Sequence, residues 1–155
     1  MFFLSIQSLQ NLSKIKNTDL PVKNMIAQKA ASFIPDQSVL YLDTGSTVTC
    51  LARLLKETRS GLTIITNSLS VTNALVGSDH SVIVAGGQLN SNNLSLEGYQ
   101  SSAFLSTVKF EYAFFGSNGF ERHKGPTTCE FLDVQSKQAA LNNARTNIVL
   151  AEGSK

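Results

Sequence analysis

The sequence predicts an α/β fold in which a mostly parallel sheet is flanked by helices. Short apolar runs alternate along the chain with segments of helical spacing, as in strand–helix–strand units around a parallel sheet. The apolar runs, such as Val39–Leu42, are bounded by polar residues, which is typical of strands buried on both faces. The length of 155 residues, of which 42% are hydrophobic, suits one domain with a substantial core.

The first elements follow a segment without a clear period. We interpret residues 1–21 as a lead-in or linker segment, so that the domain is expected to span residues 22–155. Val22–Phe33 carries apolar residues at helical spacing, which predicts an amphipathic helix, and Pro35-Asp36 ends it. Val39–Leu42 is then the first predicted strand.

Strands and helices continue to alternate after a polar segment at residues 43–47. Val48, Leu51 and Leu55 have helical spacing and predict a helix directly after this segment. Turn formers such as Gly, Asn and Pro separate the later elements. These are a strand at 62–65, a helix at 69–76, a strand at 81–85, a helix at 98–108, a strand at 110–115, a helix at 134–144 and a strand at 147–151.

Composition argues against several classes of function. A formal net charge of +2 is not the basic surface that nucleic-acid binding requires. No apolar run approaches the roughly 20 residues of a membrane span, and the opening lacks a secretory pattern, so we expect a cytoplasmic protein with reduced thiols at Cys50 and Cys129. Neither the cysteines nor His80 and His123 have metal-ligand spacing, and no metal or cofactor is predicted.

Polar and glycine residues follow the predicted strands at their carboxyl ends, where open parallel sheets bind ligands. Thr44-Gly45-Ser46-Thr47 joins a strand to a helix, so unpaired N–H groups, the positive end of the helix dipole and several hydroxyls suit a phosphate there. A plain helix cap by Ser46 or Thr47 is the alternative. Asp43-Thr44-Gly45-Ser46 also spells the aspartic-protease signature, but those enzymes are all-β, and here a helix follows.

Other strand ends supply further candidates for the same pocket. Thr66-Asn67-Ser68 and Gly116-Ser117-Asn118-Gly119 follow two strands, although Asn-Gly is also a strong turn former. Asp133 and Lys137 are four residues apart on a predicted helix, so they form either an ordinary surface pair or a grip on sugar hydroxyls. Lys155 follows the last strand and either meets an anion or is a solvated lysine.

The order of these motifs resembles the C-terminal effector-sensing domain of DeoR-type bacterial transcription repressors, over roughly residues 23 to 155. The segments that carry the resemblance are Lys23-Asn24-Met25-Ile26-Ala27, Leu42-Asp43-Thr44-Gly45-Ser46-Thr47, Thr66-Asn67-Ser68, Gly86-Gly87-Gln88-Leu89, Ser95-Leu96-Glu97-Gly98, Phe115-Gly116-Ser117-Asn118-Gly119, Gly125-Pro126-Thr127-Thr128, Lys137 and Ala151-Glu152-Gly153-Ser154-Lys155. Asn118 stands where the family often has Asp, Asp133 where it often has Glu, and Glu152 where it has Asp. An isomerase needs a carboxylate base, so Asn118 argues against retained catalysis.

The resemblance implies a fold related to ribose-5-phosphate isomerase and coenzyme A transferases. It also implies a domain that senses a phosphorylated sugar or related metabolite and so alters operator binding by the full-length protein. The expected effector-binding residues are Asp43, Thr44, Gly45, Ser46, Thr47, Thr66, Asn67, Ser68, Gly116, Ser117, Asn118, Asp133, Lys137 and Lys155.

The resemblance also bears on partners and on activity. The family's winged helix-turn-helix precedes this domain and residues 1 to 22 are too few to form it, so DNA binding is expected only through a missing module. Charged residues make up 15%, a proportion that predicts a surface partly covered by another subunit and hence a homo-oligomer. We expect no enzymatic activity. The alternatives are a sugar-phosphate isomerase of the same fold and a structural oligomerisation domain with an empty pocket.

Overall fold

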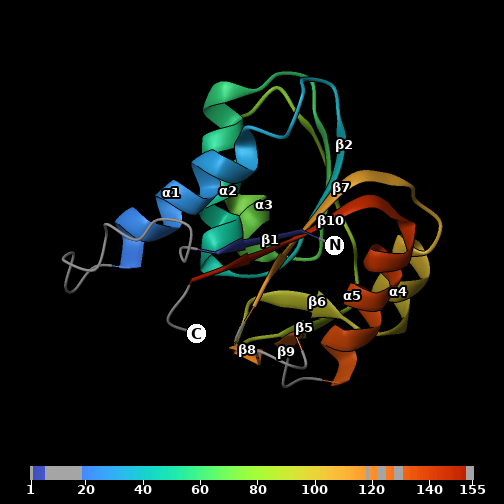
Figure 1. Ribbon diagram of the computed structural model, residues 1–155. Coiled ribbons are helices and arrows are strands. Elements are labelled where there is room, and N and C mark those ends of the chain that lie inside the picture. Colours follow the sequence, from blue (N-terminus) through green and yellow to red (C-terminus); the bar gives the residue numbers. More distant parts are fainter. Residues whose placement is uncertain (1, 6–18, 118, 122–124, 128–130, 153–155) are drawn as a thin grey trace.

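A six-stranded parallel sheet with helices on both faces organises the chain in the computed structural model (Figure 1). The structure describes residues 2–5, 19–117, 119–121, 125–127 and 131–152. The strand order is β1-β10-β7-β2-β3-β4, and every neighbouring pair is parallel. The predicted fold class is therefore confirmed.

The strands of this sheet are short and most are buried. Their bounds are β1 Phe2–Ser5, β2 Val39–Leu42, β3 Thr63–Thr66, β4 Ser81–Val84, β7 Phe110–Gly116 and β10 Ala144–Ala151. Successive side chains of a strand point to opposite faces of the sheet. In the central strand β2, Leu40 and Leu42 therefore enter one core and Tyr41 enters the other. Burial on both faces explains why this strand is a continuous apolar run.

The helices form two layers that cover the two faces (Figure 1). On one face lie α1 (Asp19–Ala31), α2 (Ser46–Thr58) and α3 (Leu69–Leu75), whose core residues include Ile26, Leu51 and Val71. On the other lie α4 (Tyr99–Leu105) and α5 (Phe131–Asn143), which contribute Leu105 and Ala140. Among the described residues, no helix is both long enough and apolar enough to cross a membrane.

Three elements differ from those expected from the sequence. Phe2–Ser5, inside the expected lead-in segment, forms the edge strand β1 and pairs with β10. Two antiparallel hairpins are also present: β5 (Gln88–Asn90) with β6 (Ser95–Glu97), and β8 (Gly119–Glu121) with β9 (Gly125–Thr127). All of these strands have three or four residues, which is too short for an alternating pattern to show in a sequence.

The β5–β6 hairpin is held against the carboxyl end of β3. The backbone N–H of Leu69 donates to the carbonyl of Leu94 at 2.8 Å, and the N–H of Leu96 donates to the carbonyl of Asn67, also at 2.8 Å. At the base of the hairpin, a Cβ added to Gly87 would lie 2.4 Å from the Glu97 carbonyl oxygen. Only glycine permits this backbone approach, which places the hairpin turn beside the strand ends.

Candidate functional site

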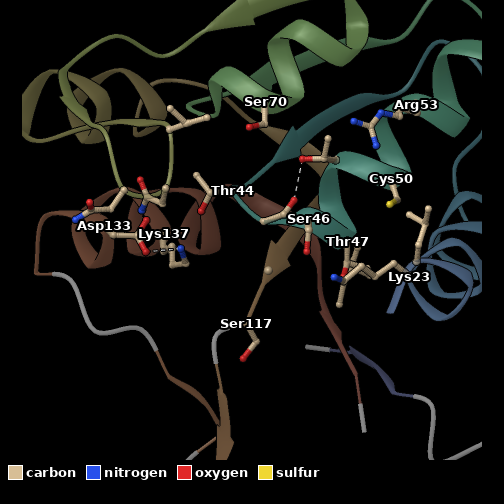
Figure 2. Close-up of a pocket in the computed structure, with 18 residues that line it drawn as sticks. Lys23, Thr44, Ser46, Thr47, Cys50, Arg53, Ser70, Ser117, Asp133 and Lys137 are labelled. Carbon is tan, nitrogen blue, oxygen red and sulfur yellow. Dashed lines mark hydrogen bonds and ion pairs between the residues drawn. The ribbon is translucent and has the colours of Figure 1, made fainter. Parts of the chain in front are cut away.

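A cavity of about 550 Å³ opens at the carboxyl ends of β2 and β7 (Figure 2). Its walls come from the start of α1, the first turns of α2, the β5–β6 turn and α5. The lining residues are Leu20, Lys23, Thr44, Gly45, Ser46, Thr47, Thr49, Cys50, Arg53, Ser70, Asn92, Asn93, Leu94, Gly116, Ser117, Asp133, Lys137 and Leu150. Eight of these are residues that the sequence predicted for a ligand site, and they come from three separate motifs.

The first turn of α2 faces this cavity without a side-chain cap. Gly45 is the N-cap residue, with φ of 130°, and no side chain hydrogen bonds to the helix start. The alternative reading of Ser46 or Thr47 as a plain cap is therefore not what the structure shows. The first N–H groups of a helix have no partner within the helix and carry its positive dipole end. This turn can accordingly bind an anion in the cavity.

Two glycines bring the loop before α2 against the end of β7. A Cβ added to Gly116 would lie 2.4 Å from the carbonyl oxygen of Thr44, and one added to Gly45 would lie 3.5 Å from the Gly116 Cα. The floor of the cavity is thus main chain in contact with main chain. The sequence places these glycines about 70 residues apart, in two motifs that it predicted to share one pocket.

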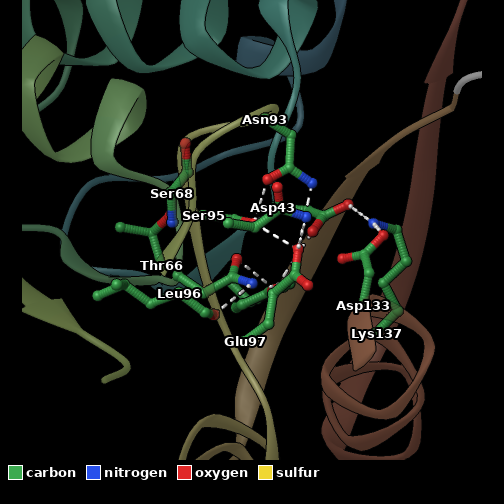
Figure 3. Close-up of polar contacts among 12 residues, drawn as sticks. Asp43, Thr66, Ser68, Asn93, Ser95, Leu96, Glu97, Asp133 and Lys137 are labelled. Carbon is green, nitrogen blue, oxygen red and sulfur yellow. Dashed lines mark hydrogen bonds and ion pairs between the residues drawn. The ribbon is translucent and has the colours of Figure 1, made fainter. Parts of the chain in front are cut away.

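Lys137 lies between two carboxylates at one end of the cavity (Figure 3). Its Nζ is 3.0 Å from Oδ2 of Asp43 and 2.5 Å from Oδ2 of Asp133. The Asp43 side chain is fully buried, that of Asp133 is 4% exposed and that of Lys137 is 17% exposed. The pair at positions 133 and 137 is therefore not an ordinary surface pair, and its third partner, Asp43, comes from the polar segment that follows β2.

Burial and charge shift the pKa values in this cluster in opposite senses. Burial raises the pKa of Asp43, Lys137 lowers it, and the net shift is upward. Burial alone lowers the pKa of Lys137, but the two carboxylates outweigh it and the net shift is upward. Burial, followed by the charges of Asp43 and Asp133, raises the pKa of Tyr41 well above its usual range, so that this phenol keeps its proton.

The predicted residues behind the cavity support its walls from inside the protein. Tyr41 Oη donates to Asn67 Oδ1 at 3.0 Å, and Asn67 Nδ2 donates to the carbonyl of Leu96 at 3.3 Å. The N–H of Ser68 donates to Thr66 Oγ1 at 3.0 Å, and Ser68 Oγ caps α3. Of the described site candidates, Asp43, Thr66, Asn67 and Ser68 are buried and do not line the cavity.

Several lining residues were not predicted from the sequence. Cys50 and Arg53 continue the cavity wall along α2. Cys50 follows Thr47 by three residues and Arg53 follows Cys50 by three, and this helical spacing is the signal that could have found them. Lys23 enters from α1, where its Nζ is 3.8 Å from Oε1 of the buried Glu152. Nothing in the local pattern places Lys23 there, because α1 and β10 meet only through the fold. Asn118 and Lys155 lie outside the described residues.

The remaining thiol and imidazole groups have structural surroundings. Within the described ranges, no group of three or more His, Cys, Asp or Glu side chains could hold a metal ion. Cys50 is a buried free thiol. The backbone N–H of Leu62 donates to Nδ1 of His80, and Nε2 of that ring lies 3.1 Å from the Leu55 carbonyl oxygen. Cys129 and His123 fall outside the described part of the chain.

The chain is an α/β domain with a cavity at its strand ends and with the fold of ribose-5-phosphate isomerases. A D-ribose-5-phosphate isomerase in complex with phospho-erythronic acid aligns with a TM-score of 0.65 and 20% identity, covering 88% of this chain and 53% of that one. Ribose 5-phosphate isomerase A from Methanocaldococcus jannaschii aligns with a TM-score of 0.63 and 18% identity, covering 89% and 55%. At these identities the similarity establishes the fold alone.

The chain belongs to the family described as the DeoR C-terminal sensor domain, whose model matches residues 18–155. The glycerol-3-phosphate regulon repressor of Escherichia coli K12 is 32% identical over 141 residues, which are 90% of this chain and 56% of that protein. The lactose phosphotransferase system repressor of Staphylococcus aureus is 33% identical over 137 residues, covering 86% and 53%. The resemblance seen in the motifs is confirmed, and the chain spans about half the length of these curated relatives.

Proposed function

We propose that this chain is the effector-binding part of a transcriptional regulator of carbohydrate metabolism and that its cavity binds a phosphorylated sugar. The observation that carries the proposal is the uncapped first turn of α2, which faces the cavity together with Thr44, Ser46 and Thr47. The phosphate of the ligand would accept hydrogen bonds from this turn. Membership in a family of repressor sensor domains supports the same conclusion.

The buried cluster of Asp43, Asp133 and Lys137 would bind the sugar part of the ligand. Asp133 and Lys137 line the cavity, and Asp43 fixes Lys137 from behind at 3.0 Å. A carboxylate accepts hydrogen bonds from sugar hydroxyls, and an ammonium donates to a hydroxyl or carbonyl oxygen. Asn118 and Lys155 remain part of the proposed binding set, on the motif evidence given above.

The mechanism that we propose is a population shift. The sugar phosphate would favour one arrangement of subunits and thereby change the operator affinity of the full-length protein. DNA contacts would come from a separate module, and the low charge of this chain agrees with that division. Bacterial repressors act on DNA, so the proposal places the protein in the cytoplasm. The low proportion of charged residues supports the further proposal of a homo-oligomer.

A thermal-shift screen tests the proposal. The panel contains glycerol 3-phosphate, ribose 5-phosphate and glucose 6-phosphate, each beside its unphosphorylated counterpart. A ligand at 100 times its Kd adds about 2.7 kcal/mol of stability, which corresponds to a rise in Tm of about 5 to 10 °C. The phosphorylated compound should raise the Tm, and its unphosphorylated counterpart should not. If no sugar phosphate raises the Tm of the folded chain, the sensor proposal fails, and the alternative of a structural oligomerisation domain replaces it.

A matched pair of threonine variants on α2 locates the phosphate. Thr47 lines the cavity, whereas Thr58 lies at the other end of the same helix and bonds to the Leu54 carbonyl. A hydrogen bond to a charged group contributes about 1.5 to 3 kcal/mol, so Thr47→Val should weaken binding by about tenfold or more. Thr58→Val should leave affinity unchanged. Equal effects of the two variants would remove the phosphate from this loop.

An isomerase is the second candidate, because the buried Asp133–Lys137 pair lines the cavity of a fold that isomerases share. The relatives are named repressors, so we propose binding without turnover. NMR of ribose 5-phosphate incubated with the chain distinguishes the two functions. The sugar signals should stay unchanged, and steady conversion to the ketose that is lost in Asp133→Asn would instead establish an enzyme.

A further inference from the structure

The turn of the β5–β6 hairpin contains a leucine in an unfavourable backbone conformation. Leu94 has φ of 54°, in the left-handed region that favours glycine. Among the described residues, Gln37 is the other position outside glycine with a positive φ, and it lies in an exposed turn remote from the cavity. A large side chain is disfavoured in this region, and glycine would avoid the steric cost.

Hydrogen bonds on both sides of Leu94 hold it in this conformation. Its carbonyl accepts the N–H of Leu69 at the start of α3, and the next residue, Ser95, forms a bridge with Ser68. The buried Glu97 Oε1 accepts hydrogen bonds from Ser95 Oγ at 2.5 Å and from Asn93 Nδ2 at 3.2 Å. Strain that neighbouring contacts maintain in this way marks functional positions.

Leu94 lies at the cavity, where its side chain would contact a bound ligand. Leu94 lines the cavity and is 47% exposed, beside the polar side chains of Ser70 and Asn92. Leu94 is therefore an aliphatic side chain, half exposed, at a cavity whose described lining is largely polar. A ligand with a C–H face would cover it, whereas an inorganic phosphate would not, because an aliphatic group offers no hydrogen bond.

We infer that Leu94 closes over the carbon skeleton of the effector and that this contact, separate from the phosphate contacts, selects which sugar phosphate is bound. The inference rests on the proposed function and adds a specificity-determining residue to the same site. The β5–β6 hairpin places the Leu94 side chain at the cavity, and the left-handed backbone sets its direction. The bonds from Leu94 to Leu69 and from Ser95 to Ser68 and Glu97 hold the turn in this position.

The test compares variants at Leu94 with a control on the same hairpin. Leu94→Asn suits the left-handed region and removes the aliphatic group, Leu94→Met keeps an apolar group, and Leu89→Asn alters an exposed leucine outside this cavity. Isothermal titration measures Kd for the best sugar phosphate of the panel and for inorganic phosphate. Denaturation measures the Tm of each unliganded variant.

The expected results separate the carbon contact from the phosphate contact. Leu94→Asn should weaken the sugar phosphate about fivefold, which is about 1 kcal/mol for the exposed half of a leucine. It should leave the Kd of inorganic phosphate within about twofold and the Tm unchanged or higher. Leu89→Asn should bind the sugar phosphate as the wild type does, and Leu94→Met should retain more of the affinity than Leu94→Asn.

Several outcomes would overturn the inference. Unchanged sugar-phosphate affinity in Leu94→Asn would show that the side chain does not contact the ligand. An equal loss for inorganic phosphate, or a fall in Tm, would show that the residue acts on the structure of the site instead. In these cases binding by the wild type leaves the proposed function standing. If the wild-type chain binds none of the sugar phosphates, the proposed function fails and this inference fails with it.

Discussion

Replacing Lys137 by methionine removes the one cation that faces two buried carboxylates among the described residues. The Nζ that is lost lies 3.0 Å from Asp43 and 2.5 Å from Asp133, whose side chains are 0% and 4% exposed. Removing one partner from a buried ion pair costs about 3 to 5 kcal/mol, because the other charge is left without compensation. We expect a loss of this size in Lys137→Met, which lowers the Tm by about 6 to 20 °C.

The pH dependence of this loss follows from the direction of the shifts. The pKa of Asp43 is already raised above 3.8 by burial, and Lys137 lowers it, so the variant raises it further. A carboxyl with a raised folded pKa stabilises the fold fully below its unfolded pKa, and that contribution is lost as pH rises through the folded pKa. The stability gap between variant and wild type should therefore narrow as pH falls from 7.5 toward 5.

Urea denaturation at pH 7.5 and at pH 5 measures both effects. Lys109→Met is the matched control, since the exposed Lys109 donates a hydrogen bond to Asn143, and its cost should stay within about 0.5 kcal/mol. Asp133→Asn keeps the pair between Asp43 and Lys137 and should cost much less than Lys137→Met. A loss below about 1 kcal/mol in Lys137→Met, or a gap that widens at pH 5, would refute the charge argument.

Two further predictions concern the floor and the support of the cavity. Gly116→Ala places a Cβ 2.4 Å from the Thr44 carbonyl oxygen and should cost about 1 to 3 kcal/mol in chemical denaturation, whereas Gly86→Ala, which meets nothing within 4 Å, should cost under about 1 kcal/mol. A tolerated Gly116→Ala would mean that the two backbones do not touch. Tyr41→Phe leaves Asn67 Oδ1 without its 3.0 Å donor and should cost about 1 to 3 kcal/mol in the same assay; a neutral result would show that the amide finds another partner.

The elements that the sequence predicted well are those with a strong local pattern. The β2 bounds Val39–Leu42 are confirmed without change, and the helical spacing after residue 47 correctly indicated α2. The β5–β6 hairpin was not predicted, because three-residue strands give no measurable alternation and the hairpin is fixed by bonds to residues 67–69. Leu94 lies at the turn of this hairpin and was therefore not predicted as a site residue.

The site divides in a similar way between local and long-range information. The spacing of Asp133 and Lys137 indicated that they share a helix face, which the structure confirms. It could not show that Asp43, 90 positions earlier, completes the cluster, because that contact exists only when the fold brings α5 to the carboxyl end of β2. Nor could it distinguish Asn67, which lies behind the cavity wall, from Ser46, which lines it.

The contact between Gly45 and Gly116 separates two tasks within the cavity. Main-chain atoms make its floor, whereas side chains of Ser70, Asn92 and Leu94 also line it. If the proposed phosphate site is correct, substitutions at these side chains would leave the groups that bind the phosphate in place. A library that varies these three positions and keeps both glycines would retarget the domain to new sugar phosphates. The same fold would then give a set of engineered biosensors. They would share the proposed phosphate contacts and differ only in the carbon skeleton of the ligand that they bind.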